Sequence, residues 1–335
     1  MSTERPREVS IALQSDKRPD EYATIARAIE GYGFDLLSIY ADLFYQPPIV
    51  PLTIAAQATK RIRLGPAALN PFTLHPVEIA GQIATLDMVS DGRAYLGLAR
   101  GAWLDEIGID ETRPLQRMRE AIDVIERLLA GDASGYDGEH VRLAQGHRLR
   151  YEPLRPQVPL LIGSWGERLL GLAGERADDV KIGGSANPDI VPLVSDWIAA
   201  GARRAGRESS DIGICLGAVT IVDDDRDVAR GLIRREMALY LPVVAKLDPT
   251  VDIDPELTDR MAALLRDGNA DAAGRLIPDD IVDRFAFAGT PDDLIVHCEA
   301  LFAAGATRVE FGTPHGVTPE RGIRLLGERV LPALR

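Results

Sequence analysis

Apolar runs of strand length alternate along the chain with longer segments of helical periodicity. Strands are predicted over residues 9–13, 36–40, 62–68, 94–99, 160–163, 179–182, 212–222 and 308–311. Helices are predicted between them over residues 21–32, 51–59, 76–89, 115–130, 167–177, 188–205, 225–241, 291–304 and 318–334. Because eight parallel strands close a barrel, the alternation predicts an α/β fold of the (β/α)8 TIM-barrel type.

Two segments interrupt this rhythm. Residues 131–159 are rich in glycine and polar residues and predict a hairpin-like excursion before the fifth strand. Residues 246–278 predict an inserted helical cap. Insertions on a barrel usually lie over its C-terminal face, so both are expected there, where they would shape a substrate pocket. A length of 335 residues suits one barrel domain, 1–335, as well as it suits two domains.

Residues 63–101 are the most informative stretch, because they form a complete strand–helix–strand unit with small residues at both strand exits. The first strand runs into Asn70-Pro71 and the second into Arg100-Gly101, while Pro76 opens the helix between them. Strand ends lined with small residues are places where a flat ligand can lie against the backbone. The search for a site therefore starts at these exits.

Composition and charge exclude several classes of protein. Apolar residues make up 46% of the chain and the net charge is −13, which argues against a nucleic-acid partner. Cys215 and Cys298 fit neither a zinc site nor a disulfide framework, and a reducing cytoplasm suits them. The polar N-terminus and the absence of a run of about 18 apolar residues argue against secretion and membrane insertion.

The other motifs of interest are glycine-marked strand exits. The sequence holds no signature of common hydrolases or kinases, and its five histidines never stand at i, i+4 spacing, so no metal site is expected. Ser164, Trp165 and Gly166 lead from the fifth strand into a helix, and residues 183–185 (Gly-Gly-Ser) follow the sixth strand. Exposed N–H groups at a helix start suit a phosphate, so these exits suggest a phosphorylated cofactor. The alternative is that the glycines only make tight turns.

The chain resembles the bacterial luciferase-like superfamily, and within it the deazaflavin-dependent branch that includes methylenetetrahydromethanopterin reductase. The resemblance covers residues 9 to 311. The motifs that carry it are Leu64-Gly65-Pro66 with Asn70-Pro71, Ala84-Thr85-Leu86-Asp87, Ser90 with Gly92-Arg93-Ala94, Leu96-Gly97-Leu98, Gly163 with Gly166, Ser185-Ala186-Asn187-Pro188 and Gly289-Thr290-Pro291-Asp292-Asp293.

The resemblance implies a TIM-like barrel that binds coenzyme F420 at the C-terminal face, with the ring system against the third strand. A non-prolyl cis peptide would form a bulge behind the ring, joining Ala67 and Ala68, with Asn70 and Gly101 on the rim of the site. The phosphate would lie on the turn from Ser164 to Gly166 and near residues 183–185. Members are generally cytoplasmic homodimers, and the same is expected here.

One departure from the family concerns proton transfer. Members commonly carry an Asp-His pair after the second strand, but here that segment reads Tyr40-Ala41-Asp42-Leu43, so the histidine is absent. Asp42 is the first candidate for an acid, because a carboxyl group beside an apolar ring has a raised pKa; alternatively it only orients its neighbours.

Four further residues complete the candidate set, each with a structural alternative. Gln14 would hydrogen-bond the substrate or ring, or lie in a solvated turn. His75 would line the pocket as a catalytic group or cap the helix at Pro76. Arg100 would meet an anionic substrate or cofactor tail, or form a salt bridge at the rim. Trp165 would cover the cofactor or fill the core.

Three functions are compatible with these features. The first is an F420-dependent oxidoreductase that moves a hydride between the deazaflavin and a small organic substrate, reducing a C=N or C=C bond. The second is a two-component monooxygenase that uses FMN. The third is a flavin- or deazaflavin-binding protein without turnover, which the missing histidine makes conceivable.

Overall fold

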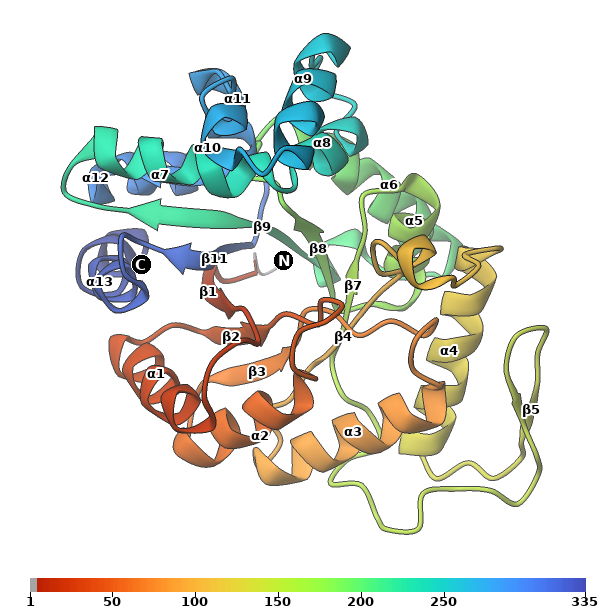
Figure 1. Cartoon of the computed structure of the whole chain (residues 1–335). Coiled ribbons are helices and arrows are strands. Elements are labelled where there is room, and N and C mark those ends of the chain that lie inside the picture. Colours follow the sequence, from red (N-terminus) through yellow and green to blue (C-terminus); the bar gives the residue numbers. More distant parts are fainter. Residues whose placement is uncertain (1–4) are drawn as a thin grey trace.

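Eight parallel strands form a ring in the computed structural model, which describes residues 5–335 (Figure 1). Their order is β3-β2-β1-β11-β9-β8-β7-β4, and two isolated bridges, Leu64 to Ala94 and Leu69 to Leu98, join β3 to β4. The strands are β1 (Glu8–Leu13), β2 (Leu36–Ile39), β3 (Arg63–Pro66), β4 (Leu96–Ala99), β7 (Leu160–Gly163), β8 (Asp179–Gly183), β9 (Gly213–Val222) and β11 (Arg308–His315). All eight predicted strands are therefore confirmed, and with them the (β/α)8 barrel.

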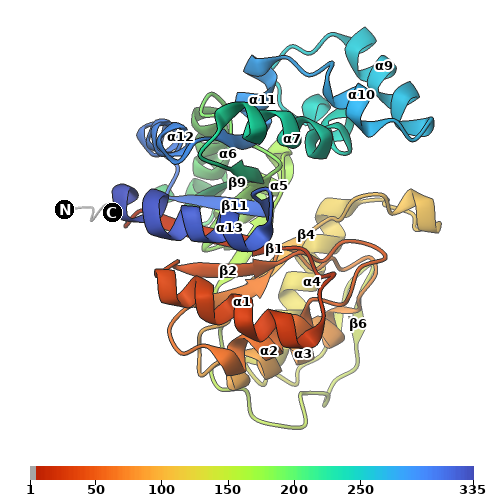
Figure 2. The same cartoon turned by 60° about the vertical axis from the view of Figure 1, so that its left-hand side comes forward.

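Helices surround the ring of strands (Figures 1 and 2). They are α1 (Pro19–Tyr32), α2 (Ile49–Ala58), α3 (Pro76–Val89), α4 (Pro114–Leu129), α5 (Glu167–Arg176), α6 (Ile190–Arg204), α7 (Arg226–Ala238), α12 (Pro291–Ala303) and α13 (Pro319–Leu325). Proline opens five of these nine helices, because its fixed φ suits the first helical position and its missing N–H is not needed there. The predicted last helix changes to π and 3-10 geometry after α13.

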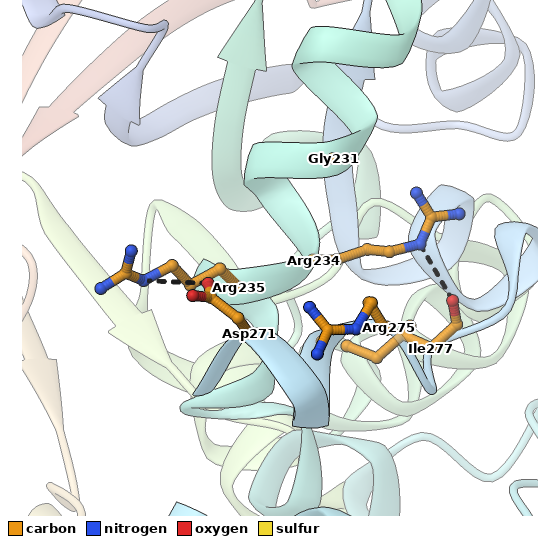
Figure 3. Close-up of a pocket in the computed structure, with 7 residues that line it drawn as sticks. Gly231, Arg234, Arg235, Asp271, Arg275 and Ile277 are labelled. Atoms are coloured by element: carbon orange, nitrogen blue, oxygen red, sulfur yellow. Dashed lines mark hydrogen bonds and ion pairs between the residues drawn. The ribbon is translucent and has the colours of Figure 1, made fainter. Parts of the chain in front are cut away.

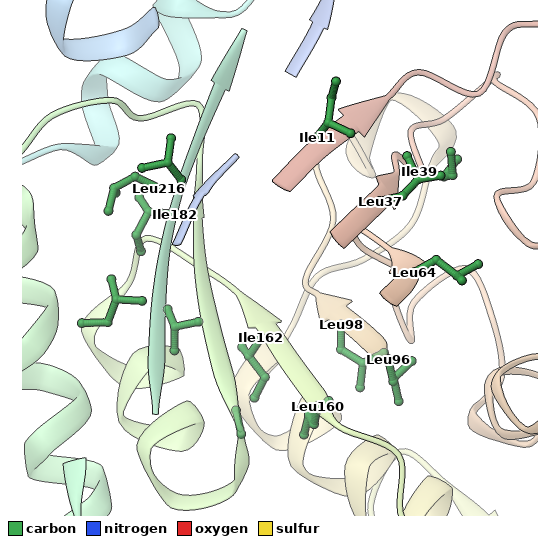
Figure 4. Close-up of a cluster of buried hydrophobic side chains, with 14 of the residues drawn as sticks. Ile11, Leu37, Ile39, Leu64, Leu96, Leu98, Leu160, Ile162, Ile182 and Leu216 are labelled. Carbon is green, nitrogen blue, oxygen red and sulfur yellow. The ribbon is translucent and has the colours of Figure 1, made fainter. Parts of the chain in front are cut away.

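The main core lies between the strands and the surrounding helices. Outward-facing side chains of the strands, such as Ile11, Leu37, Leu64 and Ile162, are fully buried there (Figure 4). Because side chains alternate across a strand, the intervening residues point into the barrel. Ser38, which lies between Leu37 and Ile39, is one of these interior residues and is buried.

A ninth strand was not predicted. β10 (Ala286–Gly289) follows α11 (Asp279–Phe285) and pairs with the second half of β9, from Val219 to Val222. Its sequence, Ala-Phe-Ala-Gly, contains one large apolar side chain among small residues, which is too short a pattern to distinguish a strand from a loop.

The excursion at 131–159 forms the expected hairpin, β5 (Tyr136–Asp137) with β6 (Arg142–Leu143), but not where it was expected. The Glu120 carboxylate of α4 accepts the backbone N–H groups of residues 139, 140 and 141 at 2.7–2.9 Å, and Arg155 pairs with Asp87 of α3 at 2.7 Å. The excursion therefore packs on the outside of the helices (Figure 1). Placing it over the C-terminal face was wrong, because it leaves from the far end of α4 and finds its polar partners along that helix.

The segment at 246–278 is helical, as predicted. It contains α9 (Pro255–Arg266) and α10 (Ala270–Gly274), follows α8 (Leu241–Val244), and projects from the barrel in Figure 2. The Asn187 amide, just beyond β8, donates hydrogen bonds to Asp248 at 2.8 Å and to Thr250 at 2.9 Å. This contact ties the start of the cap to the C-terminal end of a barrel strand.

The junction of β3 and β4 has no room for side chains on its glycines. A Cβ on Gly65 would overlap the carbonyl oxygen of Tyr95, and one on Gly97 would overlap that of Pro66. Glycine inside a strand commonly marks such a close approach of two backbones. The barrel therefore closes by backbone contact at this junction.

Replacing Gly97 by alanine is expected to lower the free energy of unfolding by about 1–3 kcal/mol, because the clash is with backbone that has no rotamer to change. Urea denaturation measures this loss. Gly31→Ala, in α1 with no atom within 4 Å of the added carbon, is the matched control and should leave stability unchanged or raise it. Equal effects of the two substitutions would contradict the close approach of the strands.

Candidate active site at the C-terminal ends of the strands

A bulge in the chain after β3 forms one wall of the candidate site. Four residues separate Leu64 from Leu69 on this side, whereas three separate their partners Ala94 and Leu98. The extra residue is accommodated around Ala67 and Ala68, which are joined by a cis peptide bond and remain partly exposed. Small side chains at this position leave backbone and methyl groups facing any ligand.

Asn70 and Gly101 organise the rim beside this wall. The Asn70 side-chain oxygen accepts the backbone N–H groups of Phe72 and Thr73 at 3.1 and 2.9 Å. Gly101 has a φ of +94°, and a Cβ there would lie 3.0 Å from the Asn70 side-chain nitrogen. Asn70 thus holds the loop after β3, and Gly101 leaves room for it.

Asp42 and Gln14 meet at the ends of β2 and β1. The Gln14 side-chain nitrogen donates to the Asp42 carboxylate at 3.1 Å, and both residues lie at the surface of the site. Loss of hydration raises the pKa of Asp42, while Gln14 and the ammonium of Lys181 oppose the rise. The arrangement can hold a proton or a polar group of a ligand.

His75 and Arg100 do not join this pair. His75 caps α3, since its Nδ1 atom accepts the N–H of Val77 at 3.2 Å. Arg100 forms an ion pair with Glu111 at 2.9 Å. The structure thus contains the structural alternative for each residue: a helix cap for His75 and a salt bridge for Arg100.

The start of α5 is the more open of the two predicted strand exits. No side chain caps this helix at Gly166, although Ser164 accepts the N–H of Gly166 at 3.0 Å. The first backbone N–H groups of α5 therefore remain available to an anion. Trp165 beside them is half-buried, and its indole N–H donates to Gly183 at 2.9 Å.

The second exit is less open. Gly184 has a φ of +81° and donates its N–H to Gly217 at 2.6 Å, so here the glycine does make a tight turn. Ser185 is fully buried and its hydroxyl accepts the N–H of Asn187 at 3.2 Å. The turn therefore folds the Ser185 side chain inward, and its contact with a cofactor stays a prediction.

Sequence reasoning missed three residues inside the barrel, which are Tyr40, Lys181 and Glu310. Lys181 of β8 pairs with the buried Glu310 of β11, whose other oxygen accepts the hydroxyls of Ser38 at 2.5 Å and Ser10 at 3.2 Å. The Lys181 ammonium lies 5.1 Å from the centre of the Tyr40 ring. Burial alone would raise the pKa of Glu310, but Lys181 and Arg308 hold it below its usual range. A charged residue within an otherwise apolar strand was the available signal.

A cavity of about 420 Å³ lies elsewhere, between α7 and α10 on the cap side (Figure 3). Its lining residues are Gly231, Arg234, Arg235, Asp271, Gly274, Arg275 and Ile277. None of them lies at a strand end. Within residues 5–335 no cluster of three potential metal ligands occurs, and no helix is long and apolar enough to cross a membrane.

A family model described as luciferase-like monooxygenase matches residues 5–308. The chain belongs to the bacterial luciferase-like family. One luciferase-like relative is 5,10-methylenetetrahydromethanopterin reductase from Archaeoglobus fulgidus, 33% identical over 335 residues that cover 97% of this chain and 99% of the relative. Another is F420-dependent glucose-6-phosphate dehydrogenase from Nakamurella multipartita, 28% identical over 95% of this chain and 93% of the relative.

A solved structure of this family has the same fold over its whole length. The coenzyme F420-dependent tetrahydromethanopterin reductase from Methanopyrus kandleri superimposes with a TM-score of 0.90 at 29% identity, covering 98% of this chain and 100% of that one. The resemblance inferred from the motifs is therefore confirmed at the level of family and fold.

Asp42→Asn is expected to raise the free energy of unfolding at pH 7. The raised pKa means that the folded chain binds this proton more tightly than the unfolded chain, so the wild type loses stability as the pH rises from about 3.9 through the folded-state pKa. Below about pH 4 the variant and the wild type should have the same free energy of unfolding. Chemical denaturation at both pH values tests this, with exposed Asp252→Asn as control; a destabilised Asp42 variant at pH 7 would contradict it.

Proposed function

We propose that this chain is a coenzyme F420-dependent oxidoreductase that transfers a hydride between the deazaflavin and a small organic substrate. The observation that carries the proposal is the pairing of two features on one barrel face. The Ala67-Ala68 bulge offers a flat wall, and the start of α5 offers uncapped N–H groups for a phosphate. The names of two similar proteins that match nearly the whole chain, the Nakamurella multipartita dehydrogenase and the Methanopyrus kandleri reductase, are F420-dependent and support the same cofactor.

The residues present fit this cofactor. F420 combines a flat ring system with a phosphodiester, and it needs a wall without bulky side chains and a separate anion seat. Methyl groups of Ala67 and Ala68 are the only side-chain atoms of the bulge, and glycine at 101 leaves space beside Asn70. Glu167 and Arg168 would hold the phosphate through their backbone N–H groups at the helix start.

When bound, the deazaflavin supplies the hydride chemistry. The chain's own contribution is to orient the two reacting molecules and to manage a proton. The bulge would contact one face of the ring, and the rim at Asn70 and Gly101 would restrict movement of the ring along that wall. Asp42, with its raised pKa, holds or accepts a proton beside Gln14, in the place of the absent histidine.

The substrate is proposed to carry a C=N or C=C bond that is reduced. This part draws on the methylenetetrahydromethanopterin reductase, which is among the relatives with the highest identity. The glucose-6-phosphate dehydrogenase relative acts on a different substrate, so the family fold is compatible with more than one. We also propose a cytoplasmic homodimer, which extends the family resemblance.

Neither alternative function has an observation of its own. Monooxygenation is suggested by the general description of the family model. A binding protein without turnover would retain the wall and the anion seat but would need no proton-holding group, and the Asp42–Gln14 pair argues against it.

The purified chain is expected to bind F420 with micromolar or tighter affinity and to bind FMN much more weakly. Ala68→Leu should weaken F420 binding at least tenfold, because a longer side chain would occupy the face against which the ring lies. Deazaflavin fluorescence measures both affinities. Ala133→Leu, a half-exposed alanine in the excursion outside the helices, is the matched control and should bind like the wild type.

Tight binding of FMN without binding of F420 would contradict the proposed cofactor. Oxidation of reduced F420 by a panel of imines and activated alkenes then tests the reaction class. Consumption of oxygen with reduced FMN, in place of such oxidation, would favour the monooxygenase.

A further inference from the structure

The Tyr40 side chain extends across the interior of the barrel at the strand ends. Tyr40 directly follows β2, and its hydroxyl reaches the backbone of Gly312 in β11, where a Cβ would overlap it. Because β1 lies between β2 and β11, the ring crosses a neighbouring strand to reach this position. Glycine at position 312 is what makes room for the phenol.

The same residue adjoins the proposed ring wall. The N–H of Ala67 donates to the carbonyl of Ile39 at 2.8 Å, so the residue after Ile39 lies next to the bulge. Tyr40 is half-buried, and no hydrogen-bond partner for its hydroxyl occurs among residues 5–335. A phenol that is held in one place without a partner is available to a ligand.

The charges around Tyr40 keep the phenol protonated. Burial raises the pKa of Tyr40 well above its usual value, and the negative charges of Glu310 and Asp42 act in the same direction. The groups that face it are Glu310 from β11, Asp42 from the loop after β2, Tyr240 from the turn before α8, Cys215 from β9 and Lys181 from β8. The hydroxyl is therefore a hydrogen-bond donor throughout the neutral range.

Lys181 lies against the ring of Tyr40. Its ammonium is buried, donates to Glu310, and stands 5.1 Å from the ring centre, which is a favourable cation–π distance. Glu310 is fixed in turn by Ser38 and Ser10. The ion pair thus gives the ring a defined support inside the barrel.

We propose that Tyr40 is a ligand-binding residue whose hydroxyl donates a hydrogen bond to a carbonyl acceptor on the deazaflavin ring, and that Lys181 is its positioning residue. The inference rests on the proposed function for the identity of the ring. It assigns a donor at a place where neither the motifs nor the relatives' names point to one.

Tyr40→Phe removes only the hydroxyl, and it should weaken F420 binding about tenfold, the usual effect of losing one ligand hydrogen bond. Deazaflavin fluorescence gives the affinity, and thermal unfolding checks that the fold is unchanged. Tyr32→Phe, at the end of α1 on the opposite end of the barrel, is the matched control and should bind like the wild type.

The outcomes separate this inference from the proposed function. If the wild type binds F420 and Tyr40→Phe binds it equally well, the inference is overturned and the function stands. If the wild type does not bind F420, both are overturned.

A double-mutant cycle tests the positioning role of Lys181. Lys181→Met is combined with Glu310→Gln so that neither member of this ion pair remains as a charge without the other. When Tyr40 is present, the two substitutions together should weaken F420 binding severalfold. In the Tyr40→Phe background they should weaken it clearly less, because their effect acts through the Tyr40 hydroxyl. Equal losses in both backgrounds would overturn the positioning role.

Discussion

The close contact of β3 with β4 is the constraint on which the site depends. Gly65 and Gly97 bring two backbones together where any side chain would overlap a carbonyl oxygen. The two strands then regain register at Leu69 and Leu98, and the extra residue between the bridges forms the bulge. Closure of the barrel and a flat, methyl-lined wall at its C-terminal end are thus consequences of the same packing.

The remaining parts of the site surround this wall on separate strands. In the proposed function, the uncapped start of α5 holds an anion and the Asp42–Gln14 pair holds a proton, while Tyr40 lies against a buried ion pair. Each group lies just after the end of a barrel strand. Such positioning suits a reaction in which the protein mainly aligns two molecules and leaves the redox chemistry to a cofactor.

Much of the fold was predictable because each barrel strand carries an outward-facing apolar run that must be buried. The bulge position followed from family resemblance, and the uncapped start of α5 followed from glycine at a helix start. β10 was missed because one phenylalanine among small residues does not produce a recognisable hydrophobic periodicity. The excursion was misplaced because the sequence does not reveal that Glu120 would hold its backbone. The Tyr40–Lys181–Glu310 group was missed because three distant strands bring it together only in the barrel.

A crystal structure of the chain with F420 tests the central claim most directly. The account predicts that the ring lies against Ala67 and Ala68, within hydrogen-bond distance of the Tyr40 hydroxyl, while the phosphate receives N–H groups from the first turn of α5. A ring bound away from the bulge, or a phosphate bound at another element, would contradict it.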